Sequence, residues 1–330
     1  MRTILIESGV ETQKAKPFLK WAGGKTQLLD EIDIRLPNKE IESGQIDTYI
    51  EPFVGGGAVF FHIAQKYQNL RHFILLDINE DLVNCYNTVK NDPDMLIGEL
   101  RRLERRYIKA DETGRNALFY VIRDEFNLDR MPAKMIFLNK TCYNGLYRVN
   151  RSNEFNVPFG GYKNPTICDE KNLRAASIVL QNVEIITADF EESERYINKD
   201  SFVYLDPPYR PISKTASFTS YAKGDFTEED QVRLADFCKR IKQKSAKFIL
   251  SNSKPKNKEP NDCFFERYYE KICVNVIAVK ATRSINCQGD GRGEIDELMI
   301  TNYEVSLWHR QEYYNIFHPI KSDPTPRIHV

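Results

Sequence analysis

Short apolar runs alternate with amphipathic helical patterns along much of the chain. One run ends at Tyr49-Ile50, a helical pattern follows at 58–67, and a second run occupies 72–76. A strand, a helix and another strand in this order predict a βαβ unit of a parallel sheet. Further apolar runs that predict strands lie at 183–187, 202–205, 248–251, 271–279 and 298–303, and a helix is expected from a Thr227 cap to about Lys244.

A long helical stretch separates the early strands from the later ones. Asp92-Pro93 favours a helix start, because proline is tolerated in the first turn. Apolar residues then recur at helical spacing as far as Tyr107, and residues 115–138 repeat this character. Residues 140–165 are rich in Asn, Gly, Tyr and Arg, which is typical of a loop.

These patterns predict an α/β fold in which one domain is interrupted by a second, mostly helical one. The sheet is expected to be mostly parallel, with a late antiparallel strand. The predicted division assigns 1–79 and 171–305 to the α/β domain, 80–170 to the insert and 306–330 to an extension without an assigned role. Within these, residues 1–15 are expected to be weakly ordered and 253–262 to form a loop.

Composition narrows the class of protein. Of the 330 residues 41% are hydrophobic and 28% charged, as in ordinary soluble proteins. No apolar stretch is long enough to span a bilayer, and the N-terminus lacks the layout of a secretory signal. The seven cysteines form no CxxC pair, which argues against a zinc site and a disulfide framework and favours the reducing cytoplasm.

The distribution of charge is more informative than its sum. The formal net charge is zero, yet residues 101–174 hold 15 Lys and Arg against 9 Asp and Glu. A local positive surface of this kind can meet nucleic-acid phosphates, and a solvated helix face is the alternative interpretation.

Two glycine-containing segments are candidates for ligand binding. Glu51-Pro52-Phe53-Val54-Gly55-Gly56-Gly57 is a predicted strand-to-helix turn at the carboxyl edge of the sheet, where nucleotide cofactors bind. Asp77 ends the next strand, about where an acidic residue binds ribose hydroxyls in dinucleotide folds. Lys20-Trp21-Ala22-Gly23-Gly24-Lys25 can bring a cation to a carboxylate, but alone it is better explained as a surface turn and lacks phosphate-loop spacing.

A third candidate, Asp189-Phe190, follows the apolar run at 183–187. The carboxylate can accept a hydrogen bond from the amino group of an adenine, and the phenylalanine can pack on its ring. A helix cap at Asp189 is the alternative, and it is favoured when this pair is taken alone.

The strongest chemical signal is Asp206-Pro207-Pro208-Tyr209, directly after the run at 202–205. The exocyclic nitrogen of adenine is a poor nucleophile, because its lone pair is delocalised into the ring. The Asp206 carboxylate and the Pro207 carbonyl can accept its two hydrogens and direct the lone pair at a sulfonium methyl, while the prolines hold the backbone rigid. Tyr209 can stack on an extruded base. A strand-ending turn with a buried tyrosine is the less favoured alternative.

In this order the segments resemble the Dam-type DNA adenine-N6 methyltransferases of the D12 class, which include modification enzymes that read GATC. The resemblance covers about residues 17–303 and implies a Rossmann-like methyltransferase sheet with an inserted target-recognition domain. It implies direct methyl transfer from S-adenosylmethionine to N6 of a flipped adenine in duplex DNA, without a metal. It also implies cofactor contacts at Trp21, Lys25, Glu51, Phe53, Gly55, Gly57, Asp77, Asp189 and Phe190, and catalytic roles for Asp206, Pro207 and Tyr209.

Residues 139–148 and 154–160 are similar to the DNA-reading hairpin of the same family. The resemblance implies that Arg148 reads the outer guanine, a pairing that suits guanine O6 and N7. The other implied contacts are Leu146 and Pro158 on thymine methyls, Tyr143 as a wedge in place of the flipped adenine with Asn144 beside it, Lys20 on the first guanine, and Lys140 as a phosphate clasp. The segment 283–293 resembles a family loop without an assigned role.

Two other functions remain open at this point. The same chemistry can act on RNA adenine or on the amide of a protein glutamine, since related turns serve planar amino groups generally. A protein that senses the adenosyl cofactor and binds DNA without turnover is a second option, which the intact Asp206 turn disfavours. The sequence gives no signal for a partner nuclease, for repair or regulation, or for oligomeric state, where a monomer is one option.

Overall fold

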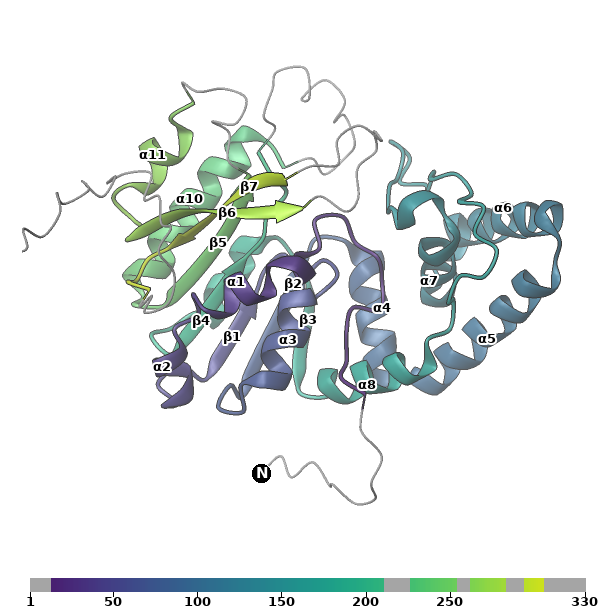
Figure 1. The fold of residues 1–330 in the computed structure, drawn as a ribbon, viewed down its shortest axis with the longest axis horizontal. Helices are drawn as coiled ribbons and strands as arrows, with labels where there is room; N and C mark the ends of the chain where they lie inside the picture. The colour runs from purple at the N-terminus through teal and green to yellow at the C-terminus, as the bar shows by residue number, and fades with distance from the viewer. Residues whose placement is uncertain (1–12, 211–225, 254–261, 283–293, 306–330) are drawn as a thin grey trace, which may run out of the picture. The chain divides into compact units, whose positions relative to one another are not determined.

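The computed structural model describes residues 13–210, 226–253, 262–282 and 294–305. The expectations for residues 1–12, 254–261, 283–293 and 306–330 therefore lie outside the described residues. Contacts between residues divide the chain into two compact units. Figure 1 colours the ribbon by residue number, so the segments of each unit can be found with its colour bar. The first unit comprises Met1–Thr26, Gly55–Gln68 and Asn79–Thr187, and the second comprises Gln27–Val54, Asn69–Ile78 and Ala188–Val330.

One mixed sheet of seven strands has the order β3-β2-β1-β4-β5-β7-β6. The strands are β1 (Thr48–Glu51), β2 (His72–Asp77), β3 (Val183–Thr187), β4 (Ser201–Leu205), β5 (Lys247–Ser253), β6 (Asn275–Thr282) and β7 (Glu294–Thr301). β1 pairs in parallel with β2 and β4, and β4 pairs in parallel with β5. β7 runs antiparallel to both β5 and β6. The expected α/β fold, with a mostly parallel sheet and a late antiparallel strand, is confirmed.

Two predicted strands are displaced in the structure. The run at 271–279 becomes β6 at 275–282, because residues 271–274 form a turn in which the N–H groups of Ile272 and Cys273 both donate to the Tyr269 carbonyl. The run at 298–303 becomes β7, which begins earlier, at Glu294. Glu294 pairs with Thr282 at the start of the β6–β7 ladder, so backbone pairing extends through charged residues that an apolar pattern does not reveal.

The first unit is built mainly from helices, seen in blue and teal in Figure 1. Its helices are α3 (Ala58–Lys66), α4 (Glu80–Asn91), α5 (Pro93–Lys109), α6 (Glu112–Asp129), α7 (Pro132–Thr141), the short η2 (Tyr143–Gly145) and α8 (Glu170–Leu180). The predicted helix start at Asp92-Pro93 is confirmed, and Asp92 caps α5 by accepting from the Met95 N–H. The helical character predicted for 115–138 is divided between two helices, because Arg130 takes a left-handed φ of 54° ahead of Pro132.

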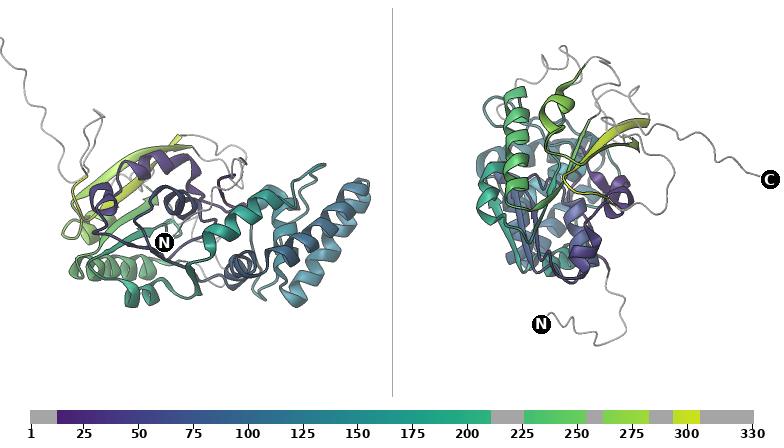
Figure 2. Two further views of the ribbon diagram at one scale, coloured as in Figure 1. Left: turned by 90° about the horizontal axis from the view of Figure 1, so that it is seen from below. Right: turned by 90° about the vertical axis from the view of Figure 1, so that its left-hand side faces the viewer.

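The second unit carries the short helices α1 (Leu29–Asp33) and α2 (Asn38–Glu42), η3 (Phe190–Tyr196), α10 (Glu228–Gln243) and α11 (Phe264–Tyr269). The short η1 (Lys25–Leu28) precedes α1. Thr227 caps α10 through a capping box with Asp230, so the predicted start of this helix is confirmed. α10 lies on one face of the strands of this unit and α1 with α2 on the other (Figure 2). No helix in the described part of the chain combines the length and apolar character needed to cross a bilayer.

Candidate functional site

The turn that follows β4 is held by buried polar side chains. Gln231 on α10 donates from Nε2 to the Pro208 carbonyl over 2.9 Å. Asn252 on β5 donates to Gln231 Oε1 over 3.3 Å, and it accepts from the Arg210 N–H over 3.4 Å. Both amides are fully buried, so breaking either contact would leave an unsatisfied polar group. These bonds fix the backbone of the segment 206–210 against two elements of the second unit.

The ring of Tyr209 is anchored at its hydroxyl end. This hydroxyl donates to Glu297 Oε2 on β7 over 2.6 Å, and Glu297 is only 8% exposed. Burial, together with the nearby carboxylates of Asp206 and Glu297, raises the pKa of Tyr209 far above its usual value. The phenol therefore stays neutral and remains a hydrogen-bond donor.

Three carboxylates lie at the same edge of the sheet, because β1, β2 and β4 run in parallel and end together. Glu51 ends β1, Asp77 ends β2 and Asp206 follows β4. Glu51 is buried and accepts from the Tyr49 hydroxyl over 2.7 Å, whereas Asp77 and Asp206 are partly exposed. Burial, followed by the charge of Glu51, raises the pKa of Tyr49. This edge thus carries acceptors for hydroxyl and amino groups.

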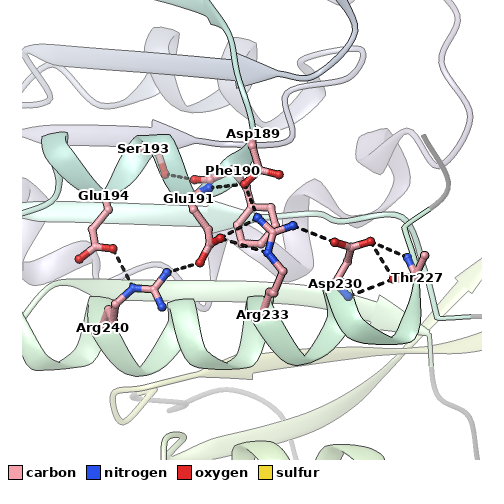
Figure 3. A network of polar contacts seen from close by, with 9 residues as sticks. All are labelled: Asp189, Phe190, Glu191, Ser193, Glu194, Thr227, Asp230, Arg233 and Arg240. Carbon is pink, nitrogen blue, oxygen red and sulfur yellow. Dashed lines mark hydrogen bonds and ion pairs between the residues drawn. The ribbon is translucent and has the colours of Figure 1, made fainter. Parts of the chain in front are cut away.

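Asp189 and Phe190 stand at the start of η3, next to α10 (Figure 3). Asp189 caps η3 by accepting from the Glu191 N–H over 3.1 Å, as the cap interpretation predicts. Phe190 is buried and stacks on Phe53, with ring centroids 5.3 Å apart. The Arg233 guanidinium lies 5.0 Å from the Phe190 centroid and binds Asp189 Oδ1 over 2.9 Å. Asp189 thus acts as a helix cap and pairs with Arg233. Its role as a cofactor ligand stays a prediction.

Trp21, in the first unit, is packed between a glycine turn and an aromatic ring. A Cβ at Gly55 would lie 2.8 Å from Trp21 Cδ1, and the Tyr147 ring stacks on the indole at 5.5 Å. The Tyr147 hydroxyl donates to Asp81 Oδ2 over 2.6 Å, and Arg130 Nη1 donates to the same oxygen over 2.9 Å. Trp21 is therefore held by the segment that also contains the predicted DNA-reading residues.

Gly57 and Lys25 are both enclosed. Gly57 has a φ of 71°, and a Cβ there would lie 2.4 Å from the Tyr86 hydroxyl oxygen. This hydroxyl donates to the Gly55 carbonyl over 3.0 Å, so the glycine turn is fixed by α4. Lys25 is 4% exposed, and its Nζ donates to the Gly23 carbonyl over 2.8 Å.

Residues 142–159 form an irregular hairpin in the first unit. Backbone bridges join Cys142 to Phe159 and Val149 to Phe155. The Tyr143 N–H donates to the Pro158 carbonyl over 2.9 Å, and Asn144 has a left-handed φ of 55°. The Tyr143 side chain is 48% exposed, Pro158 is exposed, and Leu146 is half-buried. The hairpin thus presents an aromatic ring and apolar groups to solvent, where they can meet a partner.

Arg148 is exposed on this hairpin but does not swing freely. Its Nε donates to Asn156 Oδ1 over 2.7 Å, and its Nη2 donates to the Asn156 carbonyl over 3.2 Å. A guanidinium has five N–H donors. Among the described residues no acceptor pairs with Nη1, so the far edge of the guanidinium is left for another ligand. Asn156 was not singled out from the sequence.

Asn139 ties Lys20 to the hairpin. Its side chain exchanges two bonds of 2.8 Å with the backbone of Lys20 and donates to the Gly145 carbonyl over 2.9 Å. A Cβ at Gly145 would lie 2.4 Å from Lys20 Cδ, so the lysine stem runs directly over this glycine. The Lys20 ammonium lies 5.0 Å from the Tyr162 ring centroid.

Lys140 is a second cation of the same unit. Burial, together with the charge of Lys20, lowers the pKa of Lys140 to about 8, although Asp169 opposes the shift. Its charge is therefore sensitive to pH within the physiological range.

Several residues that shape the site escaped the sequence interpretation: Asn139, Asn156, Tyr147, Asp81, Gln231, Arg233, Asn252 and Glu297. Their partners lie far away along the chain or in irregular structure. Gln231 alone had a usable signal, because it occupies the apolar stripe of α10 together with Leu234 and Cys238, where a polar residue requires a partner.

Comparison with known proteins decides the family. The family profile described as "D12 class N6 adenine-specific DNA methyltransferase" matches residues 21–285. The chain belongs to this family. It is 52% identical over 298 residues to the type II methyltransferase M.MjaIII of Methanocaldococcus jannaschii, covering 88% of this chain and 100% of the relative. It is 36% identical over 292 residues to the DNA adenine methylase of Escherichia coli (strain K12), covering 87% and 95%.

Membership of the D12 family confirms the expectation of an adenine-specific DNA methyltransferase that uses S-adenosylmethionine. It favours DNA over the RNA and protein alternatives. Each unit contributes features that suit an adenosyl cofactor. In the first unit, the glycine turn leaves no room for a Cβ at Gly55 or Gly57, as suits a backbone that a ligand approaches closely. In the second unit, taken by itself, partly exposed carboxylates stand at the sheet edge. In the described part of the chain no three His, Cys, Asp or Glu side chains gather in a way that would hold a metal ion.

Proposed function

We propose that the protein methylates N6 of adenine in GATC sequences of duplex DNA, after the target base has been flipped out of the helix. The observation that carries this proposal is the arrangement of Arg148. Two contacts to Asn156 hold one side of the guanidinium, and the opposite side has donors to spare. Guanine O6 and N7 together accept two parallel N–H donors, and a preoriented arginine loses less rotamer entropy on binding them.

The remaining hairpin residues are assigned roles that match their exposure. Tyr143 would occupy the space vacated by the flipped adenine with Asn144 beside it, and Leu146 and Pro158 would contact thymine methyl groups. Lys20 and Lys140 would bind the first guanine and a phosphate, respectively. Residues 80–170 would then be the target-recognition domain, and 1–79 with 171–305 the catalytic one.

Catalysis is assigned to Asp206, Pro207 and Tyr209. S-adenosylmethionine supplies the methyl group. The Asp206 carboxylate and the Pro207 carbonyl would accept the two hydrogens of the target amino group, and these bonds strengthen as positive charge develops on nitrogen. The Tyr209 ring, fixed through Glu297, would stack on the base. Asp206 acts as an electrostatic acceptor, because an ordinary carboxylate is a weak base toward a neutral amine.

Cofactor contacts are assigned at the two glycine-containing segments and at the sheet edge. Asp77 would bind the ribose hydroxyls, Asp189 the adenine amino group, and Lys25 the carboxylate of the methionine moiety. The other assigned contacts are Trp21, Glu51, Phe53, Gly55, Gly57 and Phe190.

The biological setting is proposed from the relatives. M.MjaIII and M1.LlaDCHI of Lactococcus lactis subsp. cremoris are both named type II methyltransferases, and the latter is 36% identical over 295 residues. A role as the modification enzyme of a restriction system is therefore the favoured setting. The six cysteines in the described part of the chain are free thiols, which fits a reducing cytoplasm.

The direct test is expression in a host that lacks adenine methylation, followed by plasmid sequencing that detects N6-methyladenine. We expect modification at GATC. Methylation confined to another motif would refute the sequence assignment, while the family assignment would stand.

An assay with tritiated methyl donor then compares GATC duplex, RNA and protein, with Asp206→Ala as the control. We expect label in duplex DNA only, and none above background with Asp206→Ala, which should still bind the cofactor. Turnover within a few-fold of the parent in this variant would remove Asp206 from catalysis.

A further inference from the structure

A cluster of charges on α10 and η3 surrounds the Asp189-Phe190 pair (Figure 3). Arg233 is at its centre. Its Nη2 donates to Asp189 Oδ1 over 2.9 Å and to Glu191 Oε2 over 2.6 Å, and its Nη1 donates to Asp230 Oδ1 over 2.8 Å. One side chain of α10 thereby connects the cap of its own helix with the cap of η3.

The two oxygens of Asp189 are in different situations. Oδ1 accepts from the Glu191 N–H over 3.1 Å and from Arg233 over 2.9 Å. Among the described residues no donor reaches Oδ2, and the dashed lines in Figure 3 join only one of the two oxygens. A carboxylate whose first oxygen is fixed by two donors cannot rotate without breaking both bonds. Its second oxygen is therefore held in one direction.

The contact with Phe190 adds a second constraint. The Arg233 guanidinium carbon lies 5.0 Å from the ring centroid of Phe190, within range of a cation–π interaction. Phe190 is 3% exposed and also packs edge-on against Phe237 of α10, with centroids 5.5 Å apart. Arg233 thus contacts both members of the pair to which the cofactor's adenine is assigned.

We propose that Arg233 is a positioning residue for cofactor selectivity: it holds Asp189 so that Oδ2 accepts from the amino group of the purine, and thereby makes the enzyme prefer an adenosyl to an inosyl ligand. An ionised carboxylate only accepts hydrogen bonds, whereas a 6-oxo purine presents an acceptor where adenine presents a donor. The preference depends on the carboxylate being held in place. This inference rests on the proposed assignment of Asp189.

Arg240 provides a matched control. It lies on the same helix, two turns further on, and also binds Glu191 and Glu194 of η3. Its guanidinium faces the ring of Phe237, 5.5 Å from the centroid, and it has no contact with Asp189. Loss of Arg240 removes the ion pairs to Glu191 and Glu194 of η3, whereas the bond from Arg233 to the Asp189 carboxylate remains.

The experiment measures calorimetric affinities of the full chain for S-adenosylhomocysteine and S-inosylhomocysteine, and the readout is their ratio. For Arg233→Ala we expect the adenosyl preference to fall by about tenfold, which corresponds to about 1.4 kcal/mol. Arg233→Lys should recover part of it, because an ammonium can still pair with Asp189. Arg240→Ala should keep the parent's ratio. Circular dichroism verifies folding, and Arg233→Gln serves as a second variant, expected to behave as Arg233→Ala does.

Four outcomes separate failure of the Arg233 proposal from failure of the Asp189 assignment. An unchanged ratio in the Arg233 variants, even with weaker binding of both ligands, would overturn the proposal, since a purely structural role changes both affinities alike. An equal loss of preference in Arg240→Ala would also overturn it. If Asp189→Ala itself keeps the parent's ratio, the assignment of Asp189 fails with it; if only Asp189→Ala lowers the ratio, the assignment stands and the role of Arg233 alone is refuted.

Discussion

The Tyr209 hydroxyl donates to the buried carboxylate of Glu297 over 2.6 Å, so a strand 88 residues away sets the orientation of the ring in the catalytic turn. In Tyr209→Phe this carboxylate would lose its donor inside the protein, at a cost of about 1–3 kcal/mol. Glu297→Gln keeps an acceptor for the hydroxyl. We therefore expect Tyr209→Phe to lower the free energy of unfolding, measured with denaturant, more than Glu297→Gln does. If both variants were as stable as the parent, the contact would add nothing to the stability of the fold.

Gln231 should affect turnover rather than cofactor binding. Gln231→Glu retains an acceptor for Asn252 but places a carboxylate oxygen against the Pro208 carbonyl, which repels it. We expect kcat to fall by at least about tenfold, because a displacement of about 1 Å at the turn is costly. Asp236, on the same helix but about half exposed, offers a control in Asp236→Asn. A loss of S-adenosylmethionine affinity without a change in kcat would contradict this expectation.

Arg148→Ala should relax selectivity for guanine. A bidentate arginine–guanine contact contributes about 1–3 kcal/mol of discrimination against a wrong base. The measurement compares methylation of GATC with single-base variants and records binding across a salt series. Arg151, exposed on the same hairpin, provides the control: Arg151→Ala should keep the preference. If Arg148→Ala instead weakens all sequences alike and reduces the salt slope by about one unit, the residue binds a phosphate.

DNA affinity should fall as the pH rises through the pKa of Lys140, which burial lowers to about 8. Below this value the ammonium can bind a phosphate, and above it the neutral amine cannot. In Lys140→Arg the charge persists, so its affinity should stay flat between pH 7 and 9, apart from effects shared with the parent. The stability change has the opposite sign: the folded protein binds fewer protons than the unfolded chain above about pH 8, so this group favours folding as pH rises. Parallel pH profiles for parent and variant would exclude Lys140 from the DNA contact.

Gly57 and Gly44 allow a paired test of the glycine turn. Both have a positive φ, of 71° and 75°, so alanine should cost each about 1–2 kcal/mol of backbone energy. A Cβ at Gly44 meets nothing within 4 Å, whereas at Gly57 it meets the Tyr86 hydroxyl at 2.4 Å. Gly57→Ala should therefore lower the thermal midpoint further and weaken S-adenosylmethionine binding. Tyr86→Phe in the same chain should relieve part of the loss, and no relief would mean that the clash is not the cause.

Local signals were sufficient for much of the fold. The helix starts at Asp92 and Thr227 could be predicted because a cap acts on backbone groups within three residues of it. The apolar runs at 202–205 and 248–251 could be predicted as strands because each is short, continuous and buried. The break near Arg130 was missed, although Pro132 offered a signal for it. The start of β7 had none, because its pairing with β6 is a property of the sheet rather than of its own composition.

The residues of the candidate site also fall into those with a local signal and those without one. Asp206 was predicted because it belongs to a motif of adjacent residues whose types together indicate the chemistry. Glu297 and Asn252 were not, because each acts through a partner dozens of residues away, and only the folded chain brings the two together. Arg148 was predicted, but Asn156, which holds it, lies in an irregular segment that has no periodic pattern to read.

The Asn139 amide has a practical implication for anyone who wishes to change the recognition sequence by exchanging hairpins among relatives. It joins Lys20 to Gly145 through hydrogen bonds to both carbonyls. A transplanted hairpin would therefore lack the Lys20 segment against which it packs in its own chain. Trp21, next along the chain, stacks on Tyr147 of the same hairpin. The smallest interchangeable cassette is therefore discontinuous: residues 20–21 must travel with 139–160. A chimera built from the hairpin alone would carry new recognition residues without the matching contacts to Lys20 and Trp21 that hold the hairpin in place.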